Sequence, residues 1–374
     1  MKKNDNLPHL LLAIDPGASS IKVVCSLVGD DKCYPFMIAP DCLDLDLVHE
    51  SDRIPEPNPD FDHRSVWVRI GTKHYAVGNL VKTKYCSYTS IKPLKNDSIV
   101  PKIVAAIASA HRHFQLPKKF KVSIASVLPP GEFIYSQKVS QELLSALRSC
   151  ETPAGKIVPI LAGIDIKPEG YGILNWHKTR GIAEDKDIGV IMFGFRNTSV
   201  LFSVEGELTG LKSSEHGFYQ VLEQISSLSG GGYNERELVV PVWNYLINKN
   251  ELGFKKISRS ANFDLELSMI KSAVEKSMTT YMRNLQSWLL SAMQKTDMIV
   301  LCGGNAEYID DNLDKFLEDY TTYYSGRGHL IGKHILYSSI PPEITETGIA
   351  VRYLDIYCLW LELSCKNQNE LVVG

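Results

Sequence analysis

The sequence predicts a mixed α/β protein built from two similar halves, and two observations support that prediction. Each half opens with two short β-type segments joined by a tight turn, at residues 10–28 and again at 187–204. Helical and β-type segments then alternate after each opening, as they do in α/β domains. Because this pattern recurs about 175 residues further along the chain, it implies two lobes of common architecture.

The first half begins with a β-hairpin. Residues 10–14 form an apolar run, and residues 20–28 alternate apolar with polar side chains after a break at Pro16 and Gly17. Such a pair of segments predicts a strand, a turn and a second strand. A Rossmann or P-loop domain would run from its first strand through glycines into a helix. Neither of those glycine motifs occurs here, so both folds are disfavoured.

The rest of the first half alternates β-type and helical segments after one irregular stretch. Residues 41–65 are acidic and rich in proline, which indicates an exposed loop or a small subdomain. The elements expected after it are a hairpin at 66–78, a helix at 98–114, a strand at 120–128 and a helix at 132–150.

The second half repeats this plan. Its hairpin joins strands at 187–192 and 199–204, and a turn at 205–207 leads into a third strand. The later elements expected are helices at 216–228, 235–248, 263–295 and 308–319, strands at 298–302 and 334–339, and a final helix at 345–363. Two similar lobes that face one another would hold a ligand in the cleft between them.

Composition limits the possible partners and compartments. The 374 residues are 44% apolar, an ordinary content for a chain with real cores, and the net charge is -3. No global field therefore draws the chain to nucleic acid or to an anionic membrane. We expect a cytoplasmic protein, since no apolar run reaches membrane-spanning length and no secretory leader is evident. The eight cysteines form no CxxC pair and are expected to be reduced.

The turn between the first two strands concentrates polar groups. Asp15, Gly17, Ser19 and Ser20 lie within six residues, and Lys22 stands on the strand that leaves the turn. Such a turn can aim backbone N–H groups and hydroxyls at phosphate oxygens, with the lysine adding charge and the aspartate holding a hydrated metal. The alternative is an ordinary hairpin with an incidental lysine.

With these residues in view, the chain resembles the actin-like ATPases, in the superfamily that includes heat-shock chaperones and sugar kinases. In particular it resembles bacterial plasmid-segregation proteins of the ParM/StbA type, especially cyanobacterial versions. The resemblance implies that Asp15, Gly17 and Lys22 belong to the first phosphate loop, with Ala18, Ser19 and Ser20 also binding nucleotide. It also implies that Asp15 is the metal-binding carboxylate.

The segment VLPPGEF, residues 127–133, resembles the family's strand end that carries a catalytic carboxylate. Glu132 would then position the water that attacks the terminal phosphate, so the resemblance assigns catalysis to Glu132, Asp15 and Lys22. The alternative for Glu132 is a glutamate that serves only the dipole of the helix it begins.

The segment FGFRNTS, residues 193–199, falls where the family has its second phosphate loop. Met192, Phe195 and Arg196 depart from the usual pattern of an aspartate followed by glycines and threonines. This departure predicts a weaker metal site. The residues still able to bind phosphate are Gly194, Arg196, Asn197 and Thr198, and the arginine could supply part of the charge of the metal.

Two further segments are candidates for binding the nucleoside. The segment VLCGGNAEYI, residues 300–309, resembles the adenosine loop, where Gly303, Gly304 and Asn305 would contact nucleotide; the alternative is a plain strand-to-helix turn. The resemblance also implies that Glu275 and Lys276 lie near the ribose and base. From spacing alone these two residues are only a solvated pair.

The resemblance implies a two-lobed actin-like ATPase fold: duplicated ribonuclease-H-like mixed-sheet domains around a nucleotide cleft. Lobe I would span 1–184 with a small subdomain at about 33–95. Lobe II would span 185–340 with a small subdomain at about 212–265. The segment 341–374 would return a C-terminal helix to lobe I.

The implied function is an ATPase that binds ATP or ADP with Mg²⁺ and polymerises into nucleotide-dependent filaments for plasmid segregation or a related cytoskeletal task. Its partners would be copies of itself and an adaptor protein that links the filament to plasmid DNA. No direct DNA contact and no membrane contact are expected. Two alternatives remain open: a small-molecule kinase that does not polymerise, and a non-hydrolysing nucleotide-binding scaffold.

Overall fold

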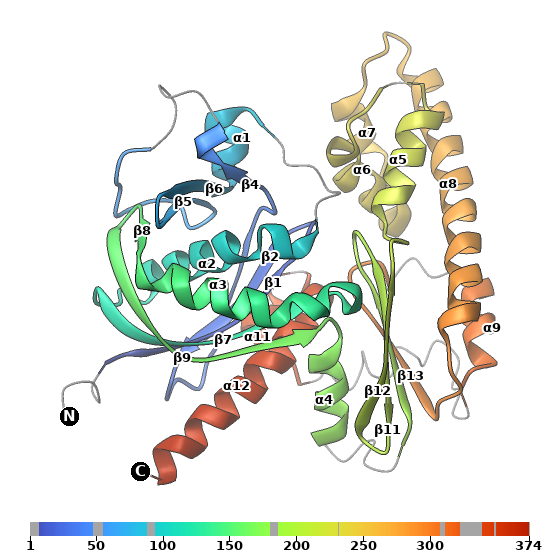
Figure 1. Ribbon diagram of the computed structural model, residues 1–374. Helices are drawn as coiled ribbons and strands as arrows, with labels where there is room; N and C mark the ends of the chain where they lie inside the picture. The colour runs from blue at the N-terminus through green and yellow to red at the C-terminus, as the bar shows by residue number, and fades with distance from the viewer. Residues whose placement is uncertain are drawn as a thin grey trace. The chain divides into compact units, whose positions relative to one another are not determined.

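The computed structural model describes residues 7–47, 55–87, 94–179, 186–230, 232–306, 311–321, 339–347 and 349–373. The chain forms two compact units (Figure 1). Unit 1 comprises residues 1–180 and 338–374, and unit 2 comprises residues 181–337. The last segment of the chain therefore folds with the first.

The main sheet of unit 1 has the strand order β3-β2-β1-β7-β9. Its strands are β1 (His9–Pro16), β2 (Ile21–Leu27), β3 (Tyr34–Ile38), β7 (Lys119–Leu128) and β9 (Gly155–Pro168). Strand β1 pairs antiparallel with β2 and parallel with β7, which pairs parallel with β9. The predicted hairpin and the strand at 120–128 are confirmed, whereas β9 was not predicted.

A smaller group of strands continues the same sheet beyond β9. It contains β4 (Cys42–Asp44), β5 (Ser65–Ile70), β6 (Lys73–Gly78) and β8 (Cys150–Thr152), in the order β8-β5-β6-β4. The predicted hairpin at 66–78 is the β5–β6 pair. Strand β3 pairs with β2 and so extends the main sheet. The small subdomain expected at about 33–95 stays a prediction.

Helices cover both faces of the main sheet of unit 1 (Figure 1). Helices α2 (Ile99–His113) and α3 (Ser136–Arg148) lie on one face, and α12 (Leu354–Val373) lies on the other beside α4 (Tyr171–Thr179). Among the described residues, this unit also contains the helices α1 (Asn79–Tyr85) and the short α11 (Pro342–Thr345). The core between α2 and the sheet includes Leu10, Leu12 and Ile14, the alternate residues of β1 on one face.

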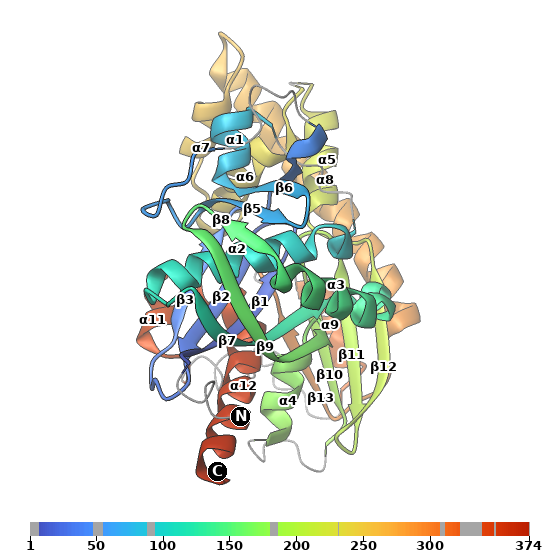
Figure 2. The ribbon, with the colours of Figure 1, turned by 60° about the vertical axis from the view of Figure 1, so that its left-hand side comes forward.

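Unit 2 repeats the strand arrangement of unit 1 (Figure 2). Its sheet has the order β12-β11-β10-β13, formed by β10 (Ile188–Phe193), β11 (Thr198–Val204), β12 (Glu207–Ser214) and β13 (Met298–Cys302). Strand β10 pairs antiparallel with β11 and parallel with β13, as β1 does with β2 and β7. The predicted doubling is therefore a duplication of topology. Except for Ser339, the strand expected at 334–339 lies outside the described residues.

Five helices are described in unit 2: α5 (Tyr219–Leu228), α6 (Glu235–Asn248), α7 (Leu252–Ile257), α8 (Phe263–Ala292) and α9 (Asp311–Glu318). Two of them begin at asparagine caps. The side chain of Asn234 accepts a hydrogen bond from the Arg236 N–H at 2.9 Å, and Asn262 accepts one from the Leu265 N–H at 3.2 Å.

Two expectations from composition can be compared with the structure. All eight cysteines are free thiols. Among the residues that the structure describes, none of the helices has the length and apolar character needed to cross a bilayer.

Candidate functional site

The β1–β2 turn of unit 1 places the predicted first-loop residues at the end of the hairpin. Asp15 on β1 stands directly opposite Lys22 on β2, and the pair before the turn is Pro16 and Ile21. Residues 17–20 form the turn itself. A side chain at Gly17 would bring its Cβ within 3.0 Å of the Ser20 carbonyl oxygen, so a small residue keeps the turn tight.

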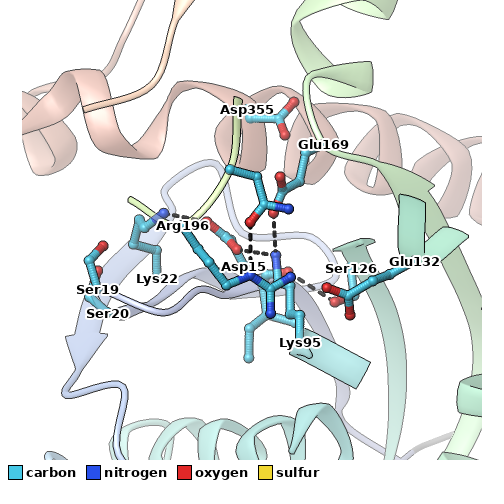
Figure 3. A network of polar contacts seen from close by, with 12 residues as sticks. Asp15, Ser19, Ser20, Lys22, Lys95, Ser126, Glu132, Glu169, Arg196 and Asp355 are labelled. Atoms are coloured by element: carbon cyan, nitrogen blue, oxygen red, sulfur yellow. Dashed lines mark hydrogen bonds and ion pairs between the residues drawn. The ribbon is translucent and has the colours of Figure 1, made fainter. Parts of the chain in front are cut away.

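Two lysines bind the Asp15 carboxylate (Figure 3). Lys22 Nζ contacts Oδ2, and Lys95 Nζ lies 2.5 Å from Oδ1. Lys95 also reaches Glu169 Oε1 at 2.9 Å. Lys95 begins the short 3-10 turn η3 (Lys95–Asp97), Glu169 directly follows β9, and only 5% of the Lys95 side chain is exposed. The result is a compact ionic cluster of two ammonium groups and two carboxylates.

The charges of this cluster stabilise one another. Burial by itself would raise the pKa of Asp15, but Lys22 and Lys95 together hold the pKa of that carboxyl well below its usual range. Burial would likewise lower the pKa of Lys95, and the carboxylates of Asp15 and Glu169 outweigh it and raise the pKa above the ordinary lysine value. Asp15 and Lys95 are therefore both ionised at neutral pH.

Glu132 is buried close to the same cluster. It lies in the 3-10 helix η4 (Pro130–Tyr135), directly beyond the end of β7, and is 4% exposed. Its Oε2 accepts a hydrogen bond from the Asn96 N–H at 2.9 Å. Glu132 therefore holds the backbone of the turn that carries Lys95. Its predicted role toward a water molecule remains a prediction.

An arginine from the last part of the chain covers the β1–β2 turn. Arg352, in the 3-10 turn η7 (Ala350–Tyr353), donates from Nη2 to Ser19 Oγ at 2.7 Å and to Ser20 Oγ at 3.0 Å. A guanidinium beside two hydroxyls is a favourable partner for phosphate oxygens. Sequence reasoning missed Lys95, Glu169 and Arg352, since no local spacing relates them to the turn.

The adjacent Asp355 anchors α12 to α4. Its carboxylate accepts hydrogen bonds from the Gly170 N–H at 2.9 Å and the Ile173 N–H at 3.4 Å, at the start of α4. Burial raises the pKa of Asp355 to about 6, although these two N–H groups lower it. A Cβ on Gly172 would come within 2.3 Å of the Asp355 carbonyl oxygen, so the two segments pack backbone to backbone.

The β10–β11 turn of unit 2 has the same length and register as the turn of unit 1. Met192 stands opposite Ser199, where unit 1 has Asp15 opposite Lys22. Residues 194–197 form the turn, in which the Gly194 N–H donates to the Asn197 carbonyl at 2.9 Å. Arg196 Nε donates to Asn197 Oδ1 at 2.8 Å. The register thus places Met192 at the position of the aspartate of the first turn.

The expected adenosine loop meets this second turn. Gly303 follows β13 with a φ of +90°, and a Cβ there would lie 2.4 Å from the Phe193 carbonyl oxygen. Asn305 Nδ2 donates to the Gly194 carbonyl at 2.8 Å. Unit 2 therefore brings together the two loops that sequence analysis assigned to nucleotide. Gly304 lies between these contacts, and the helix expected from 308 is described from Asp311 onward.

Three other residues of unit 2 were predicted to bind nucleotide. The Thr198 hydroxyl donates to the His216 carbonyl at 2.6 Å, so its proton is already used within the protein. Glu275 and Lys276 lie in the middle of α8 with exposed side chains. Their proximity to a ribose or base stays a prediction.

Comparison with known proteins identifies the fold. No protein-family model matches the sequence, and no curated protein matches it. Among solved structures, the chain is similar to the actin-like protein Alp7A, with 12% identity, a TM-score of 0.59 and coverage of 97% of each chain. It is similar to ParM in a 15-stranded filament from Clostridium botulinum, with 15% identity and a TM-score of 0.55 over 87% of this chain and 99% of that one.

The chain is also similar to Bacillus thuringiensis ParM solved with AMPPNP, with 13% identity and a TM-score of 0.54 over 96% of this chain and 99% of that one. The same ParM solved with ADP matches equally well. These likenesses confirm the predicted fold: the chain has the two-domain actin-like fold.

Proposed function

We propose that this protein is an actin-like ATPase that binds adenine nucleotide and assembles into nucleotide-dependent filaments. The observation that carries the proposal is the β1–β2 turn of unit 1. There, Lys22 stands on the strand that leaves the turn, and Arg352 donates hydrogen bonds to the hydroxyls of Ser19 and Ser20. Charge-assisted donors around a tight turn suit the oxygens of a polyphosphate.

In this proposal each loop has a distinct task. Lys22, Ser19 and Ser20 bind the phosphates, and Ala18 and Gly17 contribute backbone N–H groups. Gly194, Arg196 and Asn197 add donors from the second turn. Gly303, Gly304 and Asn305 receive the adenosine, with Glu275 and Lys276 toward the ribose and base. B. thuringiensis ParM, which has the same fold, was solved with AMPPNP and with ADP, and this supports the choice of ligand.

Self-association is the second part of the proposal. The C. botulinum protein of the same fold was solved as a filament, which supports a homopolymer here. We further propose that the filament works in the cytoplasm in plasmid segregation or a related cytoskeletal task, with an adaptor protein as its link to DNA.

Hydrolysis is assigned to Glu132, whose buried carboxylate would orient a water toward the terminal phosphorus. We expect Glu132→Gln to retain nucleotide binding, because the amide oxygen can still accept the Asn96 N–H, and to slow phosphate release at least about tenfold. Phosphate release with ATP, measured beside AMPPNP affinity, tests this. Equal turnover in the variant and the wild type would remove Glu132 from the chemistry.

Filament formation is tested by pelleting and negative-stain microscopy of the full chain with ATP, with ADP and without nucleotide. The proposal predicts more sedimentable polymer with ATP than with ADP. Polymer in equal amounts under all three conditions would contradict nucleotide control of assembly, and absence of polymer under all three would contradict assembly itself.

A second candidate, a non-hydrolysing nucleotide-binding scaffold, is favoured by one observation. Met192 occupies the register position of Asp15 in the second turn, so that turn has no carboxylate at this position. Tight AMPPNP binding without any phosphate release from ATP would select this candidate over the ATPase.

The residues around Asp15 do not fit a hydrated Mg²⁺ ion. Each of its two carboxylate oxygens already contacts a lysine ammonium. Within the parts of the chain that the structure describes, no group of three or more His, Cys, Asp or Glu side chains is arranged to hold a metal. The magnesium site expected at Asp15 therefore does not enter the proposed chemistry.

A further inference from the structure

The Asp15 carboxylate is paired with a buried ammonium group, that of Lys95. Lys95 Nζ lies 2.5 Å from that oxygen and 2.9 Å from Glu169 Oε1, so one ammonium joins two carboxylates from separate elements. This is the kind of bridging position that a divalent cation takes between acidic side chains.

The backbone around Lys95 is fixed on both sides. The Leu94 N–H donates to Asp97 Oδ2 at 3.1 Å, and the Asn96 N–H donates to Glu132 Oε2 at 2.9 Å. The Lys95 side chain is buried, and withdrawing it would leave both carboxylates without their shared partner. Lys95 is therefore held in place by its neighbouring backbone and by both carboxylates.

We propose that the Lys95 ammonium takes the place of a divalent cation at Asp15, so that the nucleotide triphosphate binds here without Mg²⁺. The inference rests on the proposed nucleotide binding and specifies its cofactor requirement. Three cationic side chains, Lys22, Lys95 and Arg352, lie at this turn, and two of them contact the Asp15 carboxylate directly.

Charge repulsion is the reason that we expect no Mg²⁺ ion at Asp15. A Mg²⁺ ion placed at Asp15 would approach two ammonium groups already in contact with that carboxylate, and like charges at such short range repel strongly. The protein therefore presents fixed ammonium and guanidinium groups to the phosphates.

The test is calorimetric titration of AMPPNP into the full-length protein, once in excess EDTA and once in excess MgCl₂. For the wild type we expect the two dissociation constants to agree within about threefold. For Lys95→Gln we expect binding to weaken in EDTA and to recover by about tenfold or more with Mg²⁺, because Asp15 Oδ1 becomes open to a hydrated ion. Acquired dependence on magnesium is a result that mere loss of structure would not produce.

Two controls accompany Lys95→Gln. The double variant Lys95→Gln with Glu169→Gln removes one charge of each sign, so it keeps the local balance, and it should acquire the same dependence on magnesium. Lys118→Gln removes an exposed lysine of unit 1 and should bind like the wild type under both conditions. Thermal unfolding of each variant verifies that it is folded.

The outcomes separate this inference from the function on which it rests. Wild-type binding that is strengthened by Mg²⁺ more than about threefold would overturn the inference and leave nucleotide binding standing. No heat of binding under either condition would overturn both. Binding by folded Lys95→Gln that remains indifferent to magnesium would show that Lys95 is not the substituting cation.

Discussion

The β1–β2 turn of unit 1 and the β10–β11 turn of unit 2 have the same backbone plan and opposite chemistry. Each connects two antiparallel strands through four residues. In each unit, the strand before the turn also pairs parallel with a later strand. In the first turn the facing pair is Asp15 and Lys22, whereas in the second it is Met192 and Ser199. Duplication has preserved the register and not the charges.

The side chains and backbone that surround the two turns also differ in charge. Ionic side chains from distant segments, Lys95 and Arg352, gather at the first turn. Contacts to the second turn include the side-chain amide of Asn305 and the close backbone approach at Gly303. One turn thus depends on charge balance and the other on steric fit, and each dependence can be measured.

The largest difference in the free energy of unfolding is expected when alanine replaces the residues at equivalent positions of β1 and β10. Asp15→Ala leaves two ammonium groups with too few partners, one of them buried, and should lower the free energy of unfolding by about 3–5 kcal/mol. Met192→Ala removes a half-buried apolar side chain and should cost only about 1–2 kcal/mol. Urea unfolding read by hydrogen exchange in each unit measures both. Equal costs would mean that the charged cluster is not energetically special.

A comparable loss is expected where the second turn is held by close packing. Gly303→Ala forces a Cβ against the Phe193 carbonyl at a φ of +90° and should destabilise unit 2 by about 3 kcal/mol. Gly163→Ala is the matched control, because its Cβ would meet Ser123 Oγ at an ordinary 3.8 Å. If both variants unfold at the wild-type urea midpoint, the 303–305 loop does not constrain the turn.

The free energy of unfolding should also depend on pH, and the sign of this dependence differs between two aspartates of unit 1. Asp355 has a folded pKa of about 6, raised by burial above the ordinary value of 3.8. Its stabilising contribution is therefore full below about pH 4 and is lost, by about 3 kcal/mol, as pH rises through about 6. The pKa of Asp15 is depressed, so its contribution is present above its ordinary pKa and is lost as the solution becomes more acidic.

Asp355→Asn separates these two contributions. The free energy of unfolding of the wild type should fall relative to that of the variant between pH 4 and pH 6, and the difference should then stay constant above about pH 7. Asp15→Asn should change the slope only at more acidic pH. Parallel stability curves for Asp355→Asn and the wild type would rule out the assignment of the titration to Asp355.

The smallest effect on stability is expected at the exposed pair on α8. Glu275→Ala and Lys276→Ala should each change the free energy of unfolding by no more than about 0.5 kcal/mol. If these side chains contact the ribose or base, AMPPNP affinity should nonetheless fall by about threefold or more. Lys295→Ala, an exposed lysine close to the end of the same helix, should alter neither quantity. Unchanged affinity in all three variants would withdraw the pair from the site.

Local patterns in the sequence predicted most of the elements that position the two turns. The alternation in residues 20–28 and the apolar runs at 10–14 and 298–302 correspond to β2, β1 and β13. Strand β9 was missed because Pro159 and Gly163 interrupt its pattern, while pairing with β7 on one side and β8 at its start stabilises it anyway. The short helix α4 was missed as well; its start depends on Asp355, far along the chain.

By itself, the sequence determined which residues share each turn, because strand periodicity and turn residues act over a few positions: Asp15 and Lys22 are only seven residues apart. Only the tertiary structure decided which charges surround that pair. Lys95 comes from 80 residues away and Arg352 from 333 residues beyond Ser19, and sequence spacing carries no information about such contacts. The physical reason is that ionic partners are chosen by distance in the folded chain, after the sheet and its helices have brought remote segments together.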